Sequence, residues 1–340
     1  MRPISIIGGG LAGLSLGIGL RRTGVPVTLT EAGQYPRHRV CGEFISGLSD
    51  QTIQRLGLAR ALSESVTLHR LQWYDAESLL RDDTLPAPAK GLSRWKLDES
   101  LADEFTELGG TLQTDSRSPR DAFNPGTVDC AGRRPRKESK WIGLKCHLQD
   151  FQLSADLEMH MSAQGYLGLS RIENGRTNLC GLFRNCGIKP PGNGAPFIFE
   201  YLRHCGFRRL LSRIEWATPI AGSECSVAAL SYAAEAPIGG GLQLGDARGL
   251  IPPFTGNGMT LAFESAALAL DPLRAFSRQE INWESCADSY TKSTRAHFGR
   301  RLTLARGLHR WLVSPALFPL TSAAARTPLF PFQSLFRLTR

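Results

Sequence analysis

Three glycines near the N-terminus have the spacing of a turn that binds phosphate groups. Gly8, Gly10 and Gly13 follow a short apolar run, and Glu31 stands 18 residues after Gly13. In such a turn the first glycine permits a tight bend and the second lets the backbone approach a pyrophosphate. The third lets the following helix pack closely on the strand. An acid at this distance accepts hydrogen bonds from ribose hydroxyls. These residues therefore predict a dinucleotide site.

The flanking sequence predicts the elements that position such a site. The apolar run suits a buried parallel strand, residues 11–22 suit a helix, and residues 25–30 suit a second strand that ends at the acid. The helix N-terminus, at Leu11 and Ala12, offers free N–H groups and a partial positive charge to phosphates. Ala32, next to the acid, belongs to the same predicted site. This order of strand, turn, helix, strand and acid is the context that the glycine motif requires.

A second glycine-bearing stretch lies more than two hundred residues later. Gly245 and Asp246 end an apolar strand, and the tripeptide of residues 256–258 precedes a helix from about Met259. A second helix N-terminus of this kind binds another anionic group or a ring carbonyl. Two such sites in one chain suit a long cofactor stretched between them, whereas an NAD dehydrogenase does not need the second.

Over about residues 3–270 the chain resembles the FAD-dependent oxidoreductases of the aromatic-hydroxylase and geranylgeranyl-reductase superfamily, which also includes flavin halogenases. The resemblance implies an α/β fold, in which a Rossmann-type (GR2-like) FAD-binding domain is interleaved with a β-sheet substrate domain. It implies that the first glycine motif and Glu31 bind the ADP half of FAD, and that Asp246 contacts the ribityl or pyrophosphate portion. Asn257 and Met259 would offer backbone N–H groups to the N1–C2=O edge of the ring. The loop beside the flavin ring then comprises Pro253, Gly256, Asn257, Gly258 and Met259.

Two shorter segments agree with this resemblance. Arg94, in SRWKLD, matches an arginine that usually points at the cofactor in this superfamily, and Gly132, in VDCAGR, matches its VDASGR segment. Aromatic hydroxylases carry an Asp-Gly pair, which helps to position FAD and NADPH, where this chain has Ala131 and Gly132. This departure argues against direct reduction of the flavin by NADPH as in the aromatic hydroxylases. It favours the reductase and halogenase branches over the hydroxylase branch.

One cysteine follows the ribose acid closely. The segment YPRHRVCG, residues 35–42, resembles the P-x-x-K-x-C-G segment of geranylgeranyl reductases, with Arg39 in the place of the lysine. In that branch the cysteine lies near the flavin ring. Cys41 is therefore the candidate catalytic residue, to tune the flavin, contact the substrate or donate a proton, and Arg37 or Arg39 would lower its pKa. Arg39 is also a candidate cofactor contact. The alternative is that Cys41 is a small residue packed where the chain crosses the cofactor.

The motifs divide the chain into interleaved segments. In the substrate domain Asn174 and Gly175 predict a hairpin turn. His147 and His160 are candidates for pocket chemistry, but we interpret both as structural or exposed residues. The tryptophan motif and catalytic lysine typical of flavin halogenases are not evident. We predict an FAD-binding domain of residues 1–65, 92–140 and 237–280, a β-sheet substrate domain of residues 66–91 and 141–236, and a helical C-terminal region of residues 281–340.

The C-terminal region is both basic and apolar. From Ser289 to Arg340 there are nine Lys or Arg residues and no Asp or Glu, so this region accounts for the whole net charge of +9. Its apolar content favours a lipophilic ligand or a peripheral membrane contact over nucleic acid. The alternative is a helix and tail packed on the body of the protein. No run reaches the roughly 18–20 apolar residues of a spanning helix. We expect a cytoplasmic location, and membrane association through this tail and its packing on the body remain two alternatives.

Together these features predict an FAD-dependent oxidoreductase that acts on a lipophilic unsaturated or aromatic small molecule. The first route is geranylgeranyl-reductase-like hydride transfer from flavin N5, with NAD(P)H or an external reductase as electron donor. The alternative is a monooxygenase that hydroxylates a phenolic or lipid-like substrate through a C4a-hydroperoxide. A flavin halogenase and a non-catalytic FAD-bound partner protein remain as further readings. The eight cysteines are dispersed with no CxxC pair, so no metal site is predicted.

Overall fold

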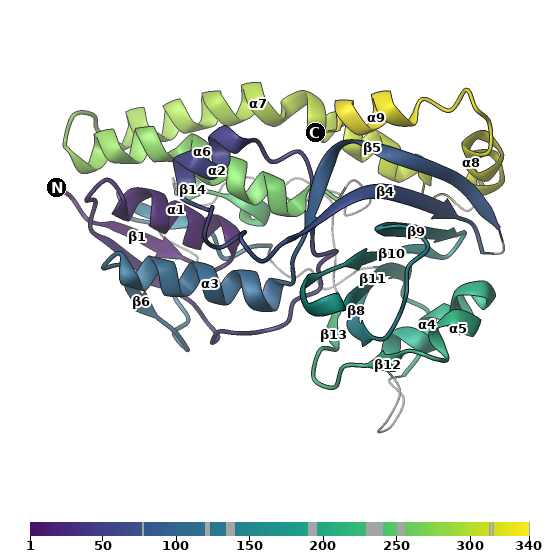
Figure 1. Ribbon diagram of the computed structural model, residues 1–340. Helices are drawn as coiled ribbons and strands as arrows, with labels where there is room; N and C mark the ends of the chain where they lie inside the picture. Colours follow the sequence, from purple (N-terminus) through teal and green to yellow (C-terminus); the bar gives the residue numbers. More distant parts are fainter. Residues whose placement is uncertain are drawn as a thin grey trace.

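The computed structural model arranges the chain as two β-sheets flanked by helices (Figure 1). The structure describes residues 1–76, 78–119, 123–133, 140–189, 196–228, 241–249, 256–312, 314 and 316–339, and of residues 310–312 the backbone alone. Pro253, which belongs to the predicted flavin loop, lies outside these residues.

The first sheet is parallel and holds the first glycine motif. In the described chain it has five strands in the order β14-β7-β1-β2-β6. The strands are short, and all but the edge strand β6 contain buried residues, as expected for a parallel sheet covered on both faces. The strands are β1 (Ile4–Ile7), β2 (Val27–Thr30), β6 (Thr111–Gln113), β7 (Thr127–Asp129) and β14 (Leu242–Gln243).

Helix α1 (Leu11–Arg21) lies at the centre of the parallel-sheet half, and residues 11–20 are all buried. A helix that is apolar on every side must be covered on every side. Its glycines allow close neighbours: Gly17 packs on Phe105 and Gly19 on Leu270. The partner helices are α3 (Arg94–Glu107) and α6 (Gly258–Ser277), and α2 (Asp50–Leu56) lies nearby.

The second sheet is mixed and has nine strands among the described residues, in the order β12-β8-β11-β10-β9-β4-β5-β3, with β13 beside β8. All its pairings are antiparallel except β4 with β9. The strands are β3 (Phe44–Ile45), β4 (Val66–Tyr74), β5 (Leu79–Gly91), β8 (Trp141–Gln149), β9 (Leu157–Ser162), β10 (Gly165–Arg171), β11 (Thr177–Arg184), β12 (Thr218–Pro219) and β13 (Cys225–Val227).

The two faces of the mixed sheet are covered differently. Along β8, Leu144, Cys146 and Leu148 point into an apolar cluster built with α4 (Phe197–His204) and α5 (Arg208–Ile214). Because side chains alternate along a strand, Lys145 and His147 lie on the other face. That second face is the one that carries the candidate site.

The C-terminal region wraps along the outside of both halves. Helix α7 (Trp283–Leu312) is one continuous helix of 30 residues, and it runs from the parallel-sheet half toward the mixed sheet (Figure 1). Helices α8 (Phe318–Ala325) and α9 (Phe332–Leu338) then dock on β5, and Phe332 of α9 also packs on Trp73 of β4. The Arg81 side chain donates hydrogen bonds to the backbone of this tail, and Gln333 donates to the carbonyl of Thr84.

Several sequence predictions can be compared directly with these elements. The hairpin at Asn174 is confirmed: β10 and β11 are antiparallel neighbours joined by the short 3-10 turn η1 (Glu173–Gly175). The first helix has the predicted start, at Leu11. The second strand begins at Val27, two residues later than predicted, because Pro26 has no N–H to donate to a sheet.

Candidate functional site

The first glycine turn is so tight that side chains are excluded at two positions. Gly8 has φ +103°, and a Cβ there would lie 2.4 Å from backbone atoms of Ala131, so β1 and the loop after β7 touch through this residue. A Cβ on Gly13 would lie 2.0 Å from the carbonyl oxygen of Gly8. Glycine is therefore required at both positions by the protein's own packing, in agreement with the roles that the motif predicts.

Gly10 differs from its neighbours because no described atom lies within 4 Å of a Cβ placed on it. It is the residue before α1, in an extended conformation with φ −85° and ψ −172° that any residue can adopt. Among the described residues no side chain caps this helix end and no acid stands in its first turn. The N–H groups at Leu11 and Ala12 thus begin a helix whose N-terminus opens on free space, which suits an anion.

Glu31 lies at the end of β2 and is held beside this turn. Its carboxylate accepts hydrogen bonds from the backbone N–H groups of Gly9, at 2.7 Å, and Gly33, at 3.0 Å, and from Arg37, at 2.6 Å. Burial alone would raise the pKa of Glu31, but Arg37 and Arg39 outweigh it, so the pKa is lowered. The group is therefore an ionised acceptor, as a ribose-binding acid must be. Ala32 follows it and is exposed.

The second predicted acid faces the same region from β14. Gly245 begins the short 3-10 turn η2 (Gly245–Ala247), and a Cβ on it would lie 3.2 Å from Ala12 of α1 and 3.7 Å from Ala262 of α6. Surrounding protein raises the pKa of Asp246, against the opposing effect of Arg94 and Arg133. The Asp246 side chain is nevertheless exposed. Asp246 is thus surrounded by protein and still open to solvent beside α1 and α6, and this open space is called the channel below.

Helix α6 presents a second open N-terminus. Gly258 begins the helix and is exposed, with no described atom within 4 Å of a Cβ, and no acid stands in the first turn. Gly256 packs against the ring of Phe44, where a Cβ would lie 2.2 Å away. Met259 is buried in the core of the parallel-sheet half.

Asn257, the residue before α6, is buried, and its Nδ2 donates to the carbonyl of Thr339. Its Oδ1 has no partner in the described part of the chain. An unpaired buried amide oxygen costs stability unless a ligand or water satisfies it. The unpaired oxygen, the two open helix ends and the channel at Asp246 together fit a long anionic dinucleotide with hydrogen-bonding rings. Gly132 has φ +73°, and it follows Ala131, which contacts the first turn at Gly8.

The two predicted cofactor-binding arginines share one buried acid. Arg94 bonds to Asp98 through both carboxylate oxygens, at 2.7 and 2.8 Å, and Arg39 reaches the same group at 3.2 Å. Burial opposes the charge on Arg94, but Asp98 outweighs it and the pKa of Arg94 is raised. Arg94 thus stays cationic, and its charge opposes the rise in the pKa of both Asp246 and Cys41.

Cys41 is half-buried, and the predicted effect of the neighbouring arginines on its pKa is wrong. Burial raises the pKa of Cys41, and this outweighs the opposing effect of Arg94. Arg37 and Arg39 do not act as predicted because they pair with Glu31 and Asp98. The Cys41 thiol accepts a hydrogen bond from the N–H of Glu43 at 3.4 Å. Cys41 is therefore a neutral thiol, able to donate a proton but not poised as a nucleophile.

A buried ionic cluster lies next to Cys41 and was missed by the sequence analysis. Glu43 contacts His147 at 2.6 Å and Lys145 at 3.3 Å, and all three side chains are at most 2% exposed. His147 had been interpreted as structural or exposed. The signal for Lys145 was available, since a lysine within the apolar strand WIGLKCHL is rarely buried without a partner. The partner itself, 102 residues earlier in the sequence, could not be identified from spacing.

His160, the other candidate histidine, is structural. It is buried, stacks on Tyr74 with ring centroids 4.6 Å apart, and contacts Glu158 at 3.0 Å. Arg213 binds the same carboxylate at 2.7 and 2.9 Å. Among described residues no group of three or more His, Cys, Asp or Glu side chains could hold a metal ion.

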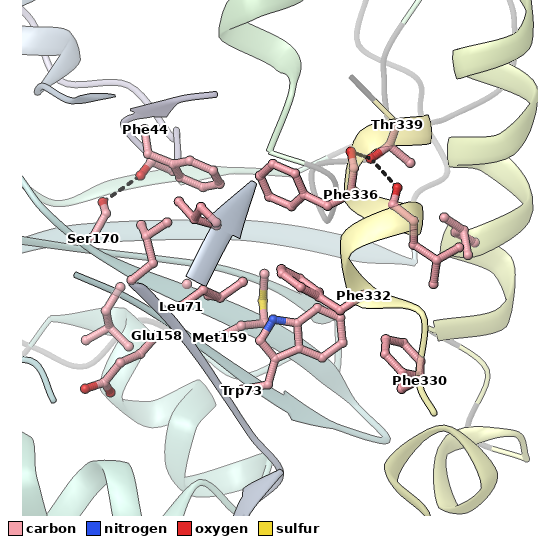
Figure 2. Close-up of a pocket in the computed structure, with 17 residues that line it drawn as sticks. Phe44, Leu71, Trp73, Glu158, Met159, Ser170, Phe330, Phe332, Phe336 and Thr339 are labelled. Atoms are coloured by element: carbon pink, nitrogen blue, oxygen red, sulfur yellow. Dashed lines mark hydrogen bonds between the residues drawn. The ribbon is translucent and has the colours of Figure 1, made fainter. Parts of the chain in front are cut away.

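An apolar pocket of about 100 Å³ lies between the mixed sheet and the C-terminal tail. Figure 2 shows aromatic and aliphatic side chains from both walls pointing into it, while the Glu158 carboxylate points away. Thr339 lines the pocket and also accepts the bond from Asn257, so the pocket adjoins the open end of α6. Its lining includes Gly42, Phe44, Trp73, Met159, Gly168, Ser170, Phe330, Phe332, Phe336 and Thr339.

This pocket explains part of the apolar character of the tail. Phe332 is buried, and Phe330 and Phe336 pack on the same cluster as Trp73. These rings form one wall of a cavity, so the apolar residues of the tail are partly used in packing on the mixed sheet. No helix in the described ranges is long and apolar enough to cross a membrane.

Comparison with known proteins places the chain within a group of similar structures. No family model matches it. A menaquinone reductase of Mycolicibacterium smegmatis is 21% identical, with 95% of this chain and 87% of that protein covered. Among solved structures, the flavin-dependent brominase Bmp2 has a TM-score of 0.75 at 18% identity, covering 99% of this chain and 92% of that one.

Two further solved structures are similar. A geranylgeranyl bacteriochlorophyll reductase-like protein of Thermoplasma acidophilum has a TM-score of 0.74 at 15% identity, covering 99% of this chain and 95% of that one. PqsL of P. aeruginosa, in complex with 2-aminobenzoylacetate, has a TM-score of 0.68 at 16% identity, covering 93% and 98%. Likeness at these identities establishes the fold alone, and it confirms the fold class predicted from the sequence.

Proposed function

The chain has the fold of the FAD-dependent oxidoreductases, and on that premise we propose that it is an FAD enzyme that reduces a neutral, lipophilic, unsaturated molecule. The observation that carries this proposal is the junction at Thr339. There the open N-terminus of α6 meets an apolar pocket, so a ring held at the helix end would face a substrate held in the pocket. A reduction is favoured because the relative named menaquinone reductase acts, by its name, on a lipophilic quinone.

The cofactor would lie beside the two open helix ends, with its linking portion in the channel at Asp246. The N-terminus of α1 would hold phosphates, Glu31 would accept from a ribose, and Asp246 would contact the linking portion. When bound, FAD supplies hydride or electron transfer, which no side chain of the protein can provide. Arg94 would add a fixed positive charge to the channel, because Asp98 keeps it in place.

The pocket would select and orient the substrate. Its lining is almost wholly apolar, so an ionic group brought there would lose its hydration without gaining a partner. The aromatic rings of Trp73, Phe332 and Phe336 exclude water from the junction. Cys41 would remain a protonated thiol beside it, available to supply a proton after transfer.

The experiment is a cofactor and product analysis of the full chain. The purified protein should release FAD on denaturation, and the bound flavin should be reduced by dithionite or NAD(P)H under anaerobic conditions. A menaquinone or a geranylgeranyl compound should then gain two hydrogens. Incorporation of an oxygen atom from labelled dioxygen would instead assign monooxygenation of a phenolic or lipid-like substrate. Incorporation of bromide or chloride would assign halogenation, and a flavin that cannot be cycled would assign a non-catalytic partner.

We also propose that the tail touches a membrane surface. Leu320, Leu329 and Leu338 are 63%, 91% and 59% exposed, on a region rich in Lys and Arg. Exposed leucines beside basic residues suit an anionic bilayer surface. Replacing the three leucines with serine should abolish sedimentation with anionic vesicles, and unchanged sedimentation would reject the contact.

A further inference from the structure

The buried ionic cluster of Glu43, Lys145 and His147 joins the two halves of the molecule. Glu43 accepts a hydrogen bond from the N–H of Arg94 at 3.0 Å, which is the first residue of α3 in the parallel-sheet half. Lys145 and His147 belong to β8 of the mixed sheet. Three donors from two halves thus converge on one carboxylate. Charges removed from water are retained only when they are paired in this way.

The cluster has a defined charge pattern. Burial would raise the pKa of Glu43, but His147 and Lys145 outweigh it, so the pKa is lowered and the carboxylate is ionised. An ionised carboxylate only accepts hydrogen bonds, so Nε2 of His147 carries a hydrogen and donates it. The Lys145 ammonium also contacts Nδ1 of His38 at 3.0 Å. Burial and Lys145 lower the pKa of His38 to about 4, so this ring is a neutral acceptor.

The backbone at Glu43 is strained as well. Its φ is +54°, in the left-handed region that residues other than glycine seldom adopt. Such a conformation persists only where the surroundings impose it, and it is commonest at functional sites. Here two sets of contacts impose it. The N–H of Leu92 donates to the Glu43 carbonyl, and three donors bind the Glu43 carboxylate.

The segment that Glu43 holds, Cys41–Phe44, contacts both halves of the molecule and lines the pocket. The carbonyl of Cys41 accepts from Asn178, at 3.0 Å, and that of Gly42 from Ser170, at 2.8 Å. Gly42 and Phe44 line the pocket. The Phe44 ring packs on Gly256 at the open end of α6. A shift of this segment would therefore move both the wall of the pocket and the loop beside the proposed ring site.

We propose that Glu43 is a positioning residue: its carboxylate, clamped by Lys145, His147 and the first N–H of α3, sets the place of Cys41–Phe44 against the flavin ring and the substrate. The proposal rests on the proposed function, because it presumes FAD in the channel. Glu43 lines no part of the pocket and acts through the segment that it holds.

The test compares two carboxylates of equal burial in the full chain. Glu43→Gln keeps the size of the side chain but turns an amide NH₂ toward donors that need an acceptor. Glu158→Gln is the matched control, since Glu158 is also 0% exposed and is bound by His160 and Arg213, with its carboxylate pointing away from the pocket (Figure 2). Both variants should lower the melting temperature. Only Glu43→Gln should change the absorbance bands and fluorescence quenching of bound FAD, with a tenfold or greater loss of FAD affinity.

A wild-type flavin spectrum and FAD affinity in Glu43→Gln, with a melting temperature lowered as in the control, would show a purely structural role and overturn the proposal. If Glu43→Gln does not fold, His147→Gln removes one donor and keeps the carboxylate. It should produce a smaller spectral change of the same sign, and an unchanged spectrum again overturns the proposal. Wild-type protein that binds no FAD contradicts the proposed function instead, before any variant is compared.

Discussion

Gly10 offers a way to separate the binding role of the first turn from its structural role. A Cβ on Gly10 would meet no described atom within 4 Å, and its φ of −85° is open to alanine. In the free protein two small effects oppose each other. Replacing glycine restricts the unfolded chain and stabilises by about 0.4–1 kcal/mol. Alanine is a poorer residue than glycine before a helix, by roughly 0.5–1 kcal/mol. Gly10→Ala should therefore melt within about 2 °C of the wild type.

With FAD present the same methyl group should be costly. It would occupy the open space before α1, where a pyrophosphate must come close to the backbone. Loss of one hydrogen bond to a charged group costs about 1.5–3 kcal/mol, which corresponds to roughly tenfold to hundredfold weaker binding. Titration of FAD against the quenching of its fluorescence, with thermal melts of the free protein, measures both quantities.

Gly13→Ala is the contrasting variant. Its Cβ would lie 2.0 Å from the carbonyl oxygen of Gly8, so the helix and strand must separate. Overpacking of this kind costs about 1–3 kcal/mol, and this variant should lose both stability and FAD affinity. Wild-type FAD affinity in Gly10→Ala would refute the reasoning, because it would mean that no phosphate approaches this turn.

Three other predictions concern the mixed sheet and the tail. Burial would raise the pKa of Glu158, but its hydrogen-bond partners lower that pKa from 4.5 to about 2. The ionised Glu158 therefore contributes about 3 kcal/mol to the free energy of unfolding above pH 4.5, and this contribution is lost as the pH falls toward 2. Urea unfolding at neutral pH and near pH 3 should show this loss of stability in the wild type and not in Glu158→Gln. Trp73 is 7% exposed, so Trp73→Ala should lower the free energy of unfolding by about 3–5 kcal/mol in the same assay. The variant should also let the pocket accept bulkier substrates. Unchanged stability would contradict the place of Trp73 in the core. A chain that ends before Phe330 should bind an apolar fluorescent dye more strongly, because one wall of the pocket is then missing; dye binding equal to that of the full chain would show that the tail does not cover it.

The parts of the site that were predictable from sequence are those whose conformation depends on residues within one short segment. The turn from Gly8 to Gly13 needs glycines for reasons that lie within about ten residues, and Glu31 follows at a fixed distance because one helix and one strand intervene. The N-terminus of α6 was predictable for the same reason, because Gly256 lies just before the helix and Gly258 begins it. Such local signals also gave the hairpin at Asn174, where a positive φ is required.

The parts that were not predictable depend on which strands become neighbours. Cys41 was assigned a low pKa from nearby arginines in the sequence, but those arginines are drawn to Glu31 and Asp98, and burial dominates. Glu43 meets Lys145 only because the segment after β2 crosses to the mixed sheet. The tail was seen as basic and apolar, yet its place over the sheet follows from side-chain bonds such as that of Gln333 to Thr84. No spacing rule encodes these contacts.

The register of the mixed sheet shows why a neutral substrate is favoured. One row of directly opposed residues crosses the sheet from Trp73 through Met159, Gly168 and Cys180 to Lys145. The first three residues line the pocket, and the last is the buried cation. Strands lie about 4.8 Å apart, so the Cα atom of Lys145 is about 10 Å from the pocket wall at Gly168.

At that distance the positive charge of an unpaired lysine would attract an anionic substrate into the pocket. The charge of Lys145 is instead already neutralised by Glu43, at 3.3 Å, and both side chains are fully buried. An anion in the pocket would therefore lose its hydration with no charge to replace it. Apolar contact, worth about 25 cal/mol for each Å² removed from water, is then the main attraction that the pocket offers. Removing Glu43 frees the cation, so Glu43→Gln should raise the affinity for carboxylate-bearing analogues relative to neutral ones, and an unchanged preference would contradict this account of selectivity.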